Sequence, residues 1–128
     1  MNDLIKELEA ATEGSAELDL KVMKALDWIP KDCRTLDVVN GNVLWDMVDG
    51  EEGNTRLRRF TRSLDATENA LPDGWIWLQM QNEFDCWQVE CVDETKEDWA
   101  YIYGKAISLP IARTIAVLKV YQGVRSES

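Results

Sequence analysis

Four arginines stand close together near the middle of the chain, directly before a predicted helix. They are Arg56, Arg58, Arg59 and Arg62. Ser63 predicts the start of the helix, because its hydroxyl can accept a hydrogen bond from a free amide of the first turn. Guanidinium groups beside such amides can bind phosphate or carboxylate. The alternative is a solvated loop whose arginines offset nearby acids such as Glu51, Glu52 and Asp65, since no glycine-rich phosphate loop accompanies them.

A second group of charged residues lies late in the chain and is acidic. It consists of Asp93, Glu94, Glu97 and Asp98. Spaced negative charges of this kind can enter the basic groove of another protein, as a nucleic-acid mimic does, or they can be a solvated connection between strands. Neither this group nor the acidic segment 46–52 has the ligand spacing of a calcium loop, and we predict no metal and no cofactor.

Tryptophan is the third residue type that could form a binding surface. The six are Trp28, Trp45, Trp75, Trp77, Trp87 and Trp99. Aromatic rings on a sheet can stack on a base or anchor a protein partner, but at strand spacing they more often fill a core. Trp45 and Trp99 lie near polar loops, so these two are the candidates for an exposed binding position.

Catalysis has little support in the sequence, and we predict that the chain is not an enzyme. Histidine is absent, which removes the commonest general base and metal ligand. The three cysteines form no CxxC pair, and Cys86 and Cys91 are five apart in a predicted strand, so they should point to opposite faces. Free buried thiols in a reducing compartment are the expected state. No nucleophile elbow or HExxH motif is present.

Composition describes one acidic domain. The 128 residues include 24 acids and 14 bases, for a net charge of −10, and are expected to form a single globular domain over 1–128. A clustered positive footprint is missing, so no direct nucleic-acid binding is expected, whereas a basic protein partner would be attracted. The sequence has neither the apolar run of about 18 residues that a membrane span needs nor a secretory signal, which indicates a cytoplasmic protein.

The elements that position these residues follow from local patterns. Helices are predicted at 3–12, from Ser15 to just before Trp28, from Ser63 to Leu71, and from Ser108 onward. Asn40-Gly41 predicts a hairpin over 36–48, and the polar segment 49–59 is expected to be a mobile loop. Three strands are predicted within 75–80, 84–92 and 99–103.

The first of these three strands is apolar on both sides. Trp75 and Trp77 alternate with Ile76, Leu78 and Met80. A strand of this kind is typical of a sheet that is covered on both faces. We therefore expect an α+β fold, a three-layer α-β-α sandwich with a mainly antiparallel sheet covered by helices on both faces.

Four stretches of the chain resemble the phage ABA sandwich domain family, a group of small bacteriophage and prophage proteins. They are Leu4 to Gly14, Leu18 to Trp28, Thr61-Arg-Ser-Leu-Asp65 with Pro72-Asp-Gly-Trp75, and Lys105 to Tyr121. The third stretch is the most specific, and residues 31–59 look like an elaboration of this chain. The resemblance implies a phage or prophage origin and α–β–α layering, and it brings no mechanism.

These observations predict a small acidic phage or prophage accessory protein of the host bacterial cytoplasm. It would act by binding a host or phage protein rather than by catalysis. One alternative is a counter-defence inhibitor whose acidic surface blocks a host nucleic-acid-binding complex. Another is a protein that binds or sequesters a nucleotide or other small ligand through the arginines. A virion or assembly component is a third alternative.

Overall fold

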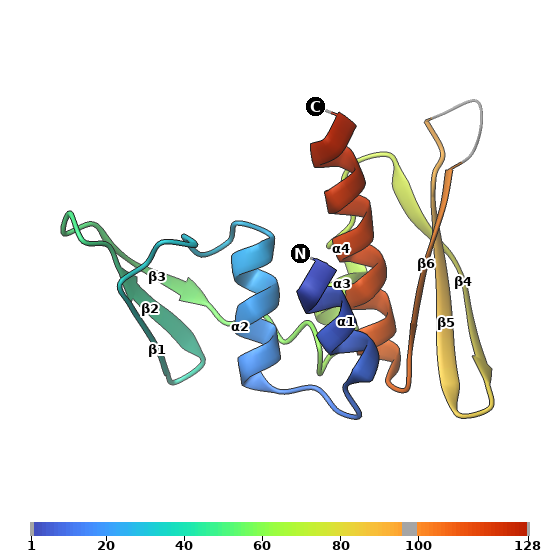
Figure 1. Cartoon of the computed structure of the whole chain (residues 1–128), viewed down its shortest axis with the longest axis horizontal. Coiled ribbons are helices and arrows are strands. Elements are labelled where there is room, and N and C mark those ends of the chain that lie inside the picture. The colour runs from blue at the N-terminus through green and yellow to red at the C-terminus, as the bar shows by residue number, and fades with distance from the viewer. Residues whose placement is uncertain (1, 96–99, 128) are drawn as a thin grey trace.

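A computed structural model of the chain describes residues 2–95 and 100–127. In chain order its elements are α1 (Asn2–Ala10), α2 (Ala16–Ala25), β1 (Thr35–Val39), β2 (Asn42–Asp46), β3 (Glu52–Arg56), α3 (Leu64–Glu68), β4 (Trp75–Glu83), β5 (Cys86–Asp93), β6 (Ala100–Ala106) and α4 (Leu109–Glu127) (Figure 1). The strands form two antiparallel sheets of three, in the orders β1-β2-β3 and β4-β5-β6. The predicted α+β class with antiparallel pairing is therefore confirmed.

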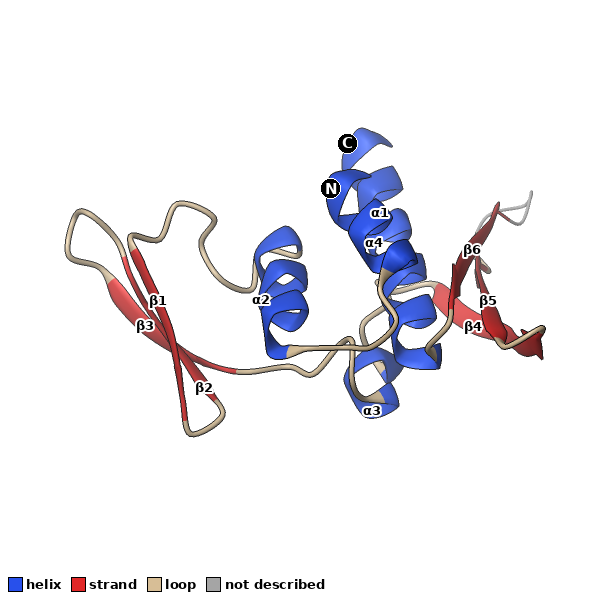
Figure 2. Cartoon of the chain, turned by 60° about the horizontal axis from the view of Figure 1, so that its bottom comes forward, coloured by secondary structure: helices blue, strands red, loops and turns tan. Residues whose placement is uncertain are grey.

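The helices lie between the two sheets. Both views show the β1-β2-β3 sheet at one end of the molecule and the β4-β5-β6 sheet at the other, with α1 and α4 against the second sheet and α3 packed on α4 (Figures 1 and 2). Ser15 caps α2 as predicted, because its Oγ accepts a hydrogen bond from the Leu18 amide at 3.1 Å. Ser63 does precede α3, but its hydroxyl makes no capping bond, and that helix ends earlier than expected, at Glu68.

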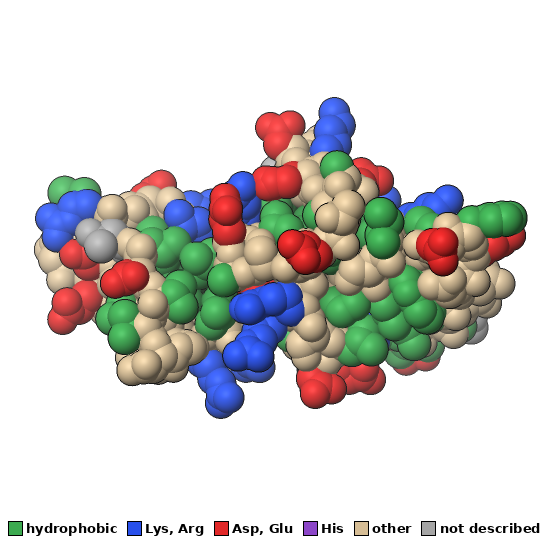
Figure 3. Space-filling model, turned by 90° about the horizontal axis from the view of Figure 1, so that it is seen from below, with side chains coloured by type: hydrophobic (Ala, Val, Ile, Leu, Met, Phe, Trp, Pro, Cys, Tyr) green, Lys and Arg blue, Asp and Glu red, His purple; other side chains and the backbone are tan. Residues whose placement is uncertain are grey.

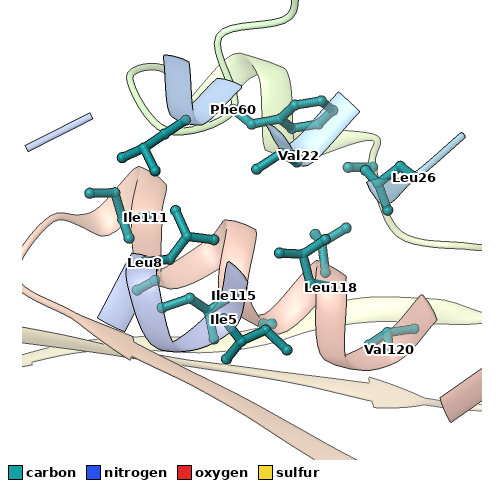
Figure 4. Packing of buried hydrophobic residues seen from close by; sticks show 14 of the residues in the cluster. Ile5, Leu8, Val22, Leu26, Phe60, Ile111, Ile115, Leu118 and Val120 are labelled. Atoms are coloured by element: carbon teal, nitrogen blue, oxygen red, sulfur yellow. The ribbon is translucent and has the colours of Figure 1, made fainter. Parts of the chain in front are cut away.

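The core is built around α4. Every residue from Ile111 to Leu118 is buried, including the polar Arg113 and Thr114. A helix that is enclosed all round must be largely apolar all round, which this segment is. Phe60 and Val22 face Ile111 and Leu118 across the core (Figure 4).

Gly104 lets α4 approach the second sheet closely. A Cβ atom at this position of β6 would overlap the carbonyl oxygen of Ala112 and lie 2.8 Å from the amide nitrogen of Ala116. The small side chains of Ala112 and Ala116 stand at the same contact and are fully buried. The sheet and the helix therefore meet backbone against backbone here.

The first sheet contains the predicted hairpin and one strand that the sequence did not predict. Asn40 and Gly41 form the turn with φ angles of 51° and 78°, the left-handed values that this hairpin turn requires. The predicted loop 49–59 is wrong in part, because Glu52–Arg56 pairs with β2 as β3. The low strand propensity of this segment is overcome by packing, since the Trp45 ring lies against Gly53, where any Cβ would overlap it.

The expected second helical layer on the β4-β5-β6 sheet is not found among residues 2–95 and 100–127. The helices lie on one side of this sheet in both views (Figures 1 and 2), and Ile76 and Leu78 on its other side are partly exposed. A register shift between Trp77 and Gln79 also moves Met80 to the helical side, where it pairs with Val89. The apolar residues on both sides of β4 therefore do not mean that helices cover both faces of this sheet.

Candidate functional site

The arginines line a polar groove between the first sheet and α3. The groove has a volume of about 880 Å³ and is lined by Asn40, Gly41, Asn42, Arg56, Leu57, Arg58, Arg59, Ser63, Asp65 and Ala66. We call it the arginine groove. Three arginines and one aspartate give it a positive balance on a chain whose net charge is −10. Lys and Arg side chains gather over this middle part of the molecule in the view from below (Figure 3).

Backbone hydrogen bonds fix the two sides of the arginine groove. The Leu57 amide donates to the Gly41 carbonyl at 2.9 Å, which joins the segment after β3 to the hairpin turn. The Arg59 carbonyl accepts from the amides of Arg62 and Ser63 at 3.0 and 2.8 Å, which sets the turn into α3. The asparagines of the hairpin therefore lie close to arginines that follow them by about fifteen positions in the sequence. The pairing of β2 with β3 brings the two groups together.

The three arginines of the groove differ in what holds them. The Arg58 guanidinium carbon lies 5.4 Å from the centre of the Trp28 ring, and that ring in turn packs edge-on against Phe60 at 5.2 Å. Arg56 and Arg59 are exposed and form no ion pair within the described part of the chain. Two guanidinium groups are thus available to an anion, and a third stands over an aromatic face that orients it.

Arg62 does not belong to the groove, although the sequence grouped it with the other three. Its Nε donates to Asp19 Oδ2 at 2.8 Å. Asp19 is fully buried, and its Oδ1 also accepts from the Thr61 amide at 2.8 Å and the Thr61 hydroxyl at 2.5 Å. Arg62 therefore helps to satisfy a buried carboxylate of α2, and its role is structural.

Thr61 also contacts Gly14 and Ser15, in the turn between α1 and α2. The Ser15 amide donates to Thr61 Oγ1 at 3.1 Å, and a Cβ on Gly14 would overlap the Thr61 carbonyl. The most specific stretch of the sequence thus builds a connection between the α1–α2 turn and the segment before α3. Asp19 was not predicted as a site residue, because its only signal in the sequence is an acid on the otherwise apolar side of a helix.

The acidic group of the sequence is only partly described, and the part seen is not a free acidic surface. Asp93 is buried to 7% exposure, and its Oδ1 accepts from the Thr95 amide at 3.0 Å and the Thr95 hydroxyl at 2.5 Å. Glu94 is exposed, with its amide bonded to the Gly74 carbonyl. Glu97, Asp98 and Trp99 lie outside the described residues. Asp93 therefore shapes a turn.

Negative charge gathers instead on the outward face of the first sheet. A hollow of about 590 Å³ is lined by Asp37, Leu44, Trp45, Asp46, Glu52, Gly53 and Asn54. We call it the acidic hollow. Arg34 pairs with Asp46 at 2.7 Å, so one of its three carboxylates is offset. These carboxylates were not predicted as a group, because they come from three different strands.

Trp45 is half-buried and does not stand out as a platform. Register places it opposite Leu36 and Gly53, and its Nε1 donates to Thr55 Oγ1 at 3.3 Å. Val43, two positions before it and so on the same face, is fully buried. The ring therefore serves mainly to cover Gly53, and the structure does not bring it to the arginine groove.

The cysteines and acids of the described residues offer little to chemistry. Burial raises the pKa of Cys91 to about 12, so this thiol is protonated at neutral pH and is a poor nucleophile. Cys86 stands five positions earlier in the same regular strand and so points to the other face, as predicted. Across residues 2–95 and 100–127, no three His, Cys, Asp or Glu side chains are grouped so that they could hold a metal ion.

Comparisons with other proteins leave the resemblance to the phage family as a prediction. No protein-family model matches the sequence, and no curated protein or solved structure matches the chain. None of the helices that the structure describes has the length and apolar character to cross a membrane.

Proposed function

We propose that this chain is a binding protein that takes up an anionic ligand in its arginine groove and does not catalyse a reaction on it. The observation that carries the proposal is the meeting of Arg56, Arg58 and Arg59 in one polar groove, with Arg56 and Arg59 free of carboxylate partners in the described residues. Guanidinium groups form their strongest hydrogen bonds with phosphate and carboxylate oxygens. The asparagines and the serine that share the groove supply neutral donors.

The ligand class that fits is a small phosphate-bearing molecule such as a nucleotide. The groove is open and polar, so it suits the charged part of a ligand more than an apolar ring. The Trp28 ring, which contacts the Arg58 guanidinium, is 38% exposed. The setting we propose is a phage or prophage accessory protein of the bacterial cytoplasm, as the resemblance implies. The three-layer arrangement also stays a proposal, since it requires another polypeptide to cover the open face of the second sheet.

Calorimetric titration with ATP and with inorganic pyrophosphate tests the groove. We expect binding to the unaltered chain and an affinity at least about 100-fold lower in Arg56→Ala/Arg59→Ala, because each charged hydrogen bond contributes about 1.5–3 kcal/mol. Arg34→Ala is the control, since Arg34 is also exposed but lies outside the groove and pairs with Asp46. Equal loss in the control, or no heat with either probe, would contradict the proposal.

The acidic hollow supports a second candidate, the binding of a basic protein. Asp37 pairs with the exposed Leu44 on the outward face of the first sheet, and Glu52 lies in the next row of that face, which combines negative charge with an apolar contact. This arrangement suits a lysine or arginine side chain, whose charged end and apolar stem both find a partner. A counter-defence inhibitor that blocks a basic host complex would use this hollow rather than the 93–98 group.

Capture of bacterial proteins on the immobilised chain at low and moderate salt tests this second candidate. We expect a basic protein that is retained at low salt, released at moderate salt, and lost in Asp37→Asn/Glu52→Gln. Glu9→Gln/Glu13→Gln removes the same charge from exposed positions elsewhere and should retain the partner. A partner whose retention does not change with salt would rule the acidic hollow out as its site.

A further inference from the structure

The second sheet presents an apolar face that points away from the helices. Residues that pair with Val89 and Cys91 face α4, because Gly104 in the same row meets that helix. The alternate residues point the other way. Among them, Ile76, Leu78, Tyr101 and Tyr103 are 37%, 44%, 45% and 46% exposed. We call this surface the outer face.

The exposed side chains of the outer face form a continuous surface rather than isolated contacts. Ile76, Val92 and Tyr101 occupy one row across the three strands, and Tyr103 pairs with Glu90 in the next row of this face. Val92, in the middle of the first row, is fully buried, and none of the described helices lies on this side of the sheet. The side chains of this face therefore form one apolar surface, against which a second flat surface can pack.

The outer face is nearly neutral on a strongly acidic molecule. By register, its charged residues are Glu83, Glu90 and Lys105, which leaves one net negative charge of the ten that the chain carries. Contacts between two copies through most of the remaining surface would bring many carboxylates together. Contact through this face avoids that repulsion, which favours a second copy of the same chain as the occupant.

Phe84 extends the apolar surface at the tip of the β4-β5 hairpin. It is 92% exposed, and it forms the turn with Asp85 at φ angles of 54° and 58°. Left-handed backbone costs a residue other than glycine about 1–2 kcal/mol, and this turn type prefers asparagine and glycine. A hollow of about 230 Å³ beside Phe84 is bordered by Gln88 and Lys105 of the outer face. A strained, exposed aromatic beside a hollow on the same face points to a contact.

The amount of exposed surface agrees with a missing partner. The chain exposes 7746 Å² at a mass of 14.7 kDa, whereas a compact monomer of that mass exposes about 6,900 Å². The excess of about 800 Å² is comparable to the area that one partner contributes to a protein interface of standard size, and the first sheet, which packs against no other described helix or strand, accounts for part of it. An uncovered sheet face is a place where such an excess arises.

We propose that the outer face, together with Phe84, binds the outer face of a second copy of this chain. Two sheets would stack about 10 Å apart around a two-fold axis, with the helices of each copy on the outside. The tyrosines and Leu78 would interdigitate at the centre, and Phe84 of each copy would lie at the rim. This surface is separate from the arginine groove, so each proposal stands or fails independently of the other.

Sedimentation velocity of the full chain over a wide concentration range tests the proposal. We expect a dimer, and we expect Leu78→Lys and Tyr103→Lys each to raise the dimer dissociation constant about 100-fold or more, because each places two desolvated charges in the interface. Leu44→Lys is the matched control, since Leu44 is 39% exposed on the first sheet, and it should leave the dimer intact. A chain that sediments as a monomer throughout, or a control that dissociates equally, overturns the proposal.

Phe84→Asn keeps the test decisive if the lysine variants fold poorly. Asparagine suits the left-handed turn, so this variant should raise the melting temperature of the monomer while it weakens the dimer. If the dimer dissociation constant of this variant is unchanged, Phe84 does not belong to the interface. If Leu78→Lys and Tyr103→Lys also fold and sediment as the unaltered chain does, a second copy is not the occupant of the outer face.

Discussion

Replacing Asp19 with alanine is expected to lower the free energy of unfolding by about 2–4 kcal/mol. The substitution removes the acceptor of the Thr61 amide, the Thr61 hydroxyl and Arg62 Nε at once. The buried Thr61 amide is left without an acceptor, which accounts for most of the loss, whereas the Thr61 hydroxyl keeps the Ser15 carbonyl at 3.2 Å as an acceptor. Arg62 contributes less, because 35% of its side chain is exposed and water can solvate the freed guanidinium.

Equilibrium denaturation with urea measures this effect. Glu17→Ala on the same helix is the control, since its side chain is 81% exposed and lies 3.7 Å from Lys21, so a change within about 0.5 kcal/mol is expected. If Asp19→Ala lowers the free energy of unfolding no more than Glu17→Ala does, the buried hydrogen bonds of Asp19 are not important to stability. The free energy of unfolding of a domain of this size is about 5–15 kcal/mol, so the expected loss is a large share of the total.

Gly104→Ala is expected to destabilise the protein by about 2–3 kcal/mol, because its one added carbon meets backbone rather than a side chain that can turn aside. The overlap is with the Ala112 carbonyl of α4, and the Ala116 amide stands 2.8 Å away. The helix must therefore move off the sheet. Since α4 is buried from Ile111 to Leu118, that movement disturbs the whole core.

Gly123→Ala offers the same chemical change with the opposite expected sign. Gly123 lies in α4 with open space where a Cβ would stand, so alanine there should stabilise the helix by about 0.5–1 kcal/mol. Thermal unfolding followed by circular dichroism compares the two variants directly. If both substitutions change the melting temperature in the same direction, the close approach at Gly104 does not have the role described.

Local signals predicted the elements well where the cause is local. The Ser15 cap depends on an amide three residues away, and the Asn40-Gly41 turn depends on two residues that tolerate left-handed backbone. The β3 strand had no such local signal, because Glu52–Arg56 is stabilised as a strand by a contact with another strand, in which Trp45 covers Gly53. Trp45 and Gly53 are paired on neighbouring strands but are eight residues apart in the sequence, so their contact leaves no periodic pattern to find.

The candidate site was predicted in part. The four arginines were found by type and spacing, but nothing in the sequence separates Arg62 from the other three, because Asp19 stands 43 residues away. The same limit applies to the apolar pattern of β4. Alternation shows which residues share a face, and a bulge at Leu78 or an uncovered face cannot be read from it. Those features depend on how whole elements meet.

The place of α4 at the centre of the core has a consequence for synthesis on the ribosome. Of the elements described, α4 is made last, yet the apolar sides of α1, α3 and the second sheet all pack against it. Until residues 109–118 leave the exit tunnel, those surfaces have no partner, and the nascent chain must carry them exposed to water. Folding of this chain is therefore expected to follow synthesis of α4 rather than to proceed element by element, and a chaperone that binds apolar segments has its longest access in that interval.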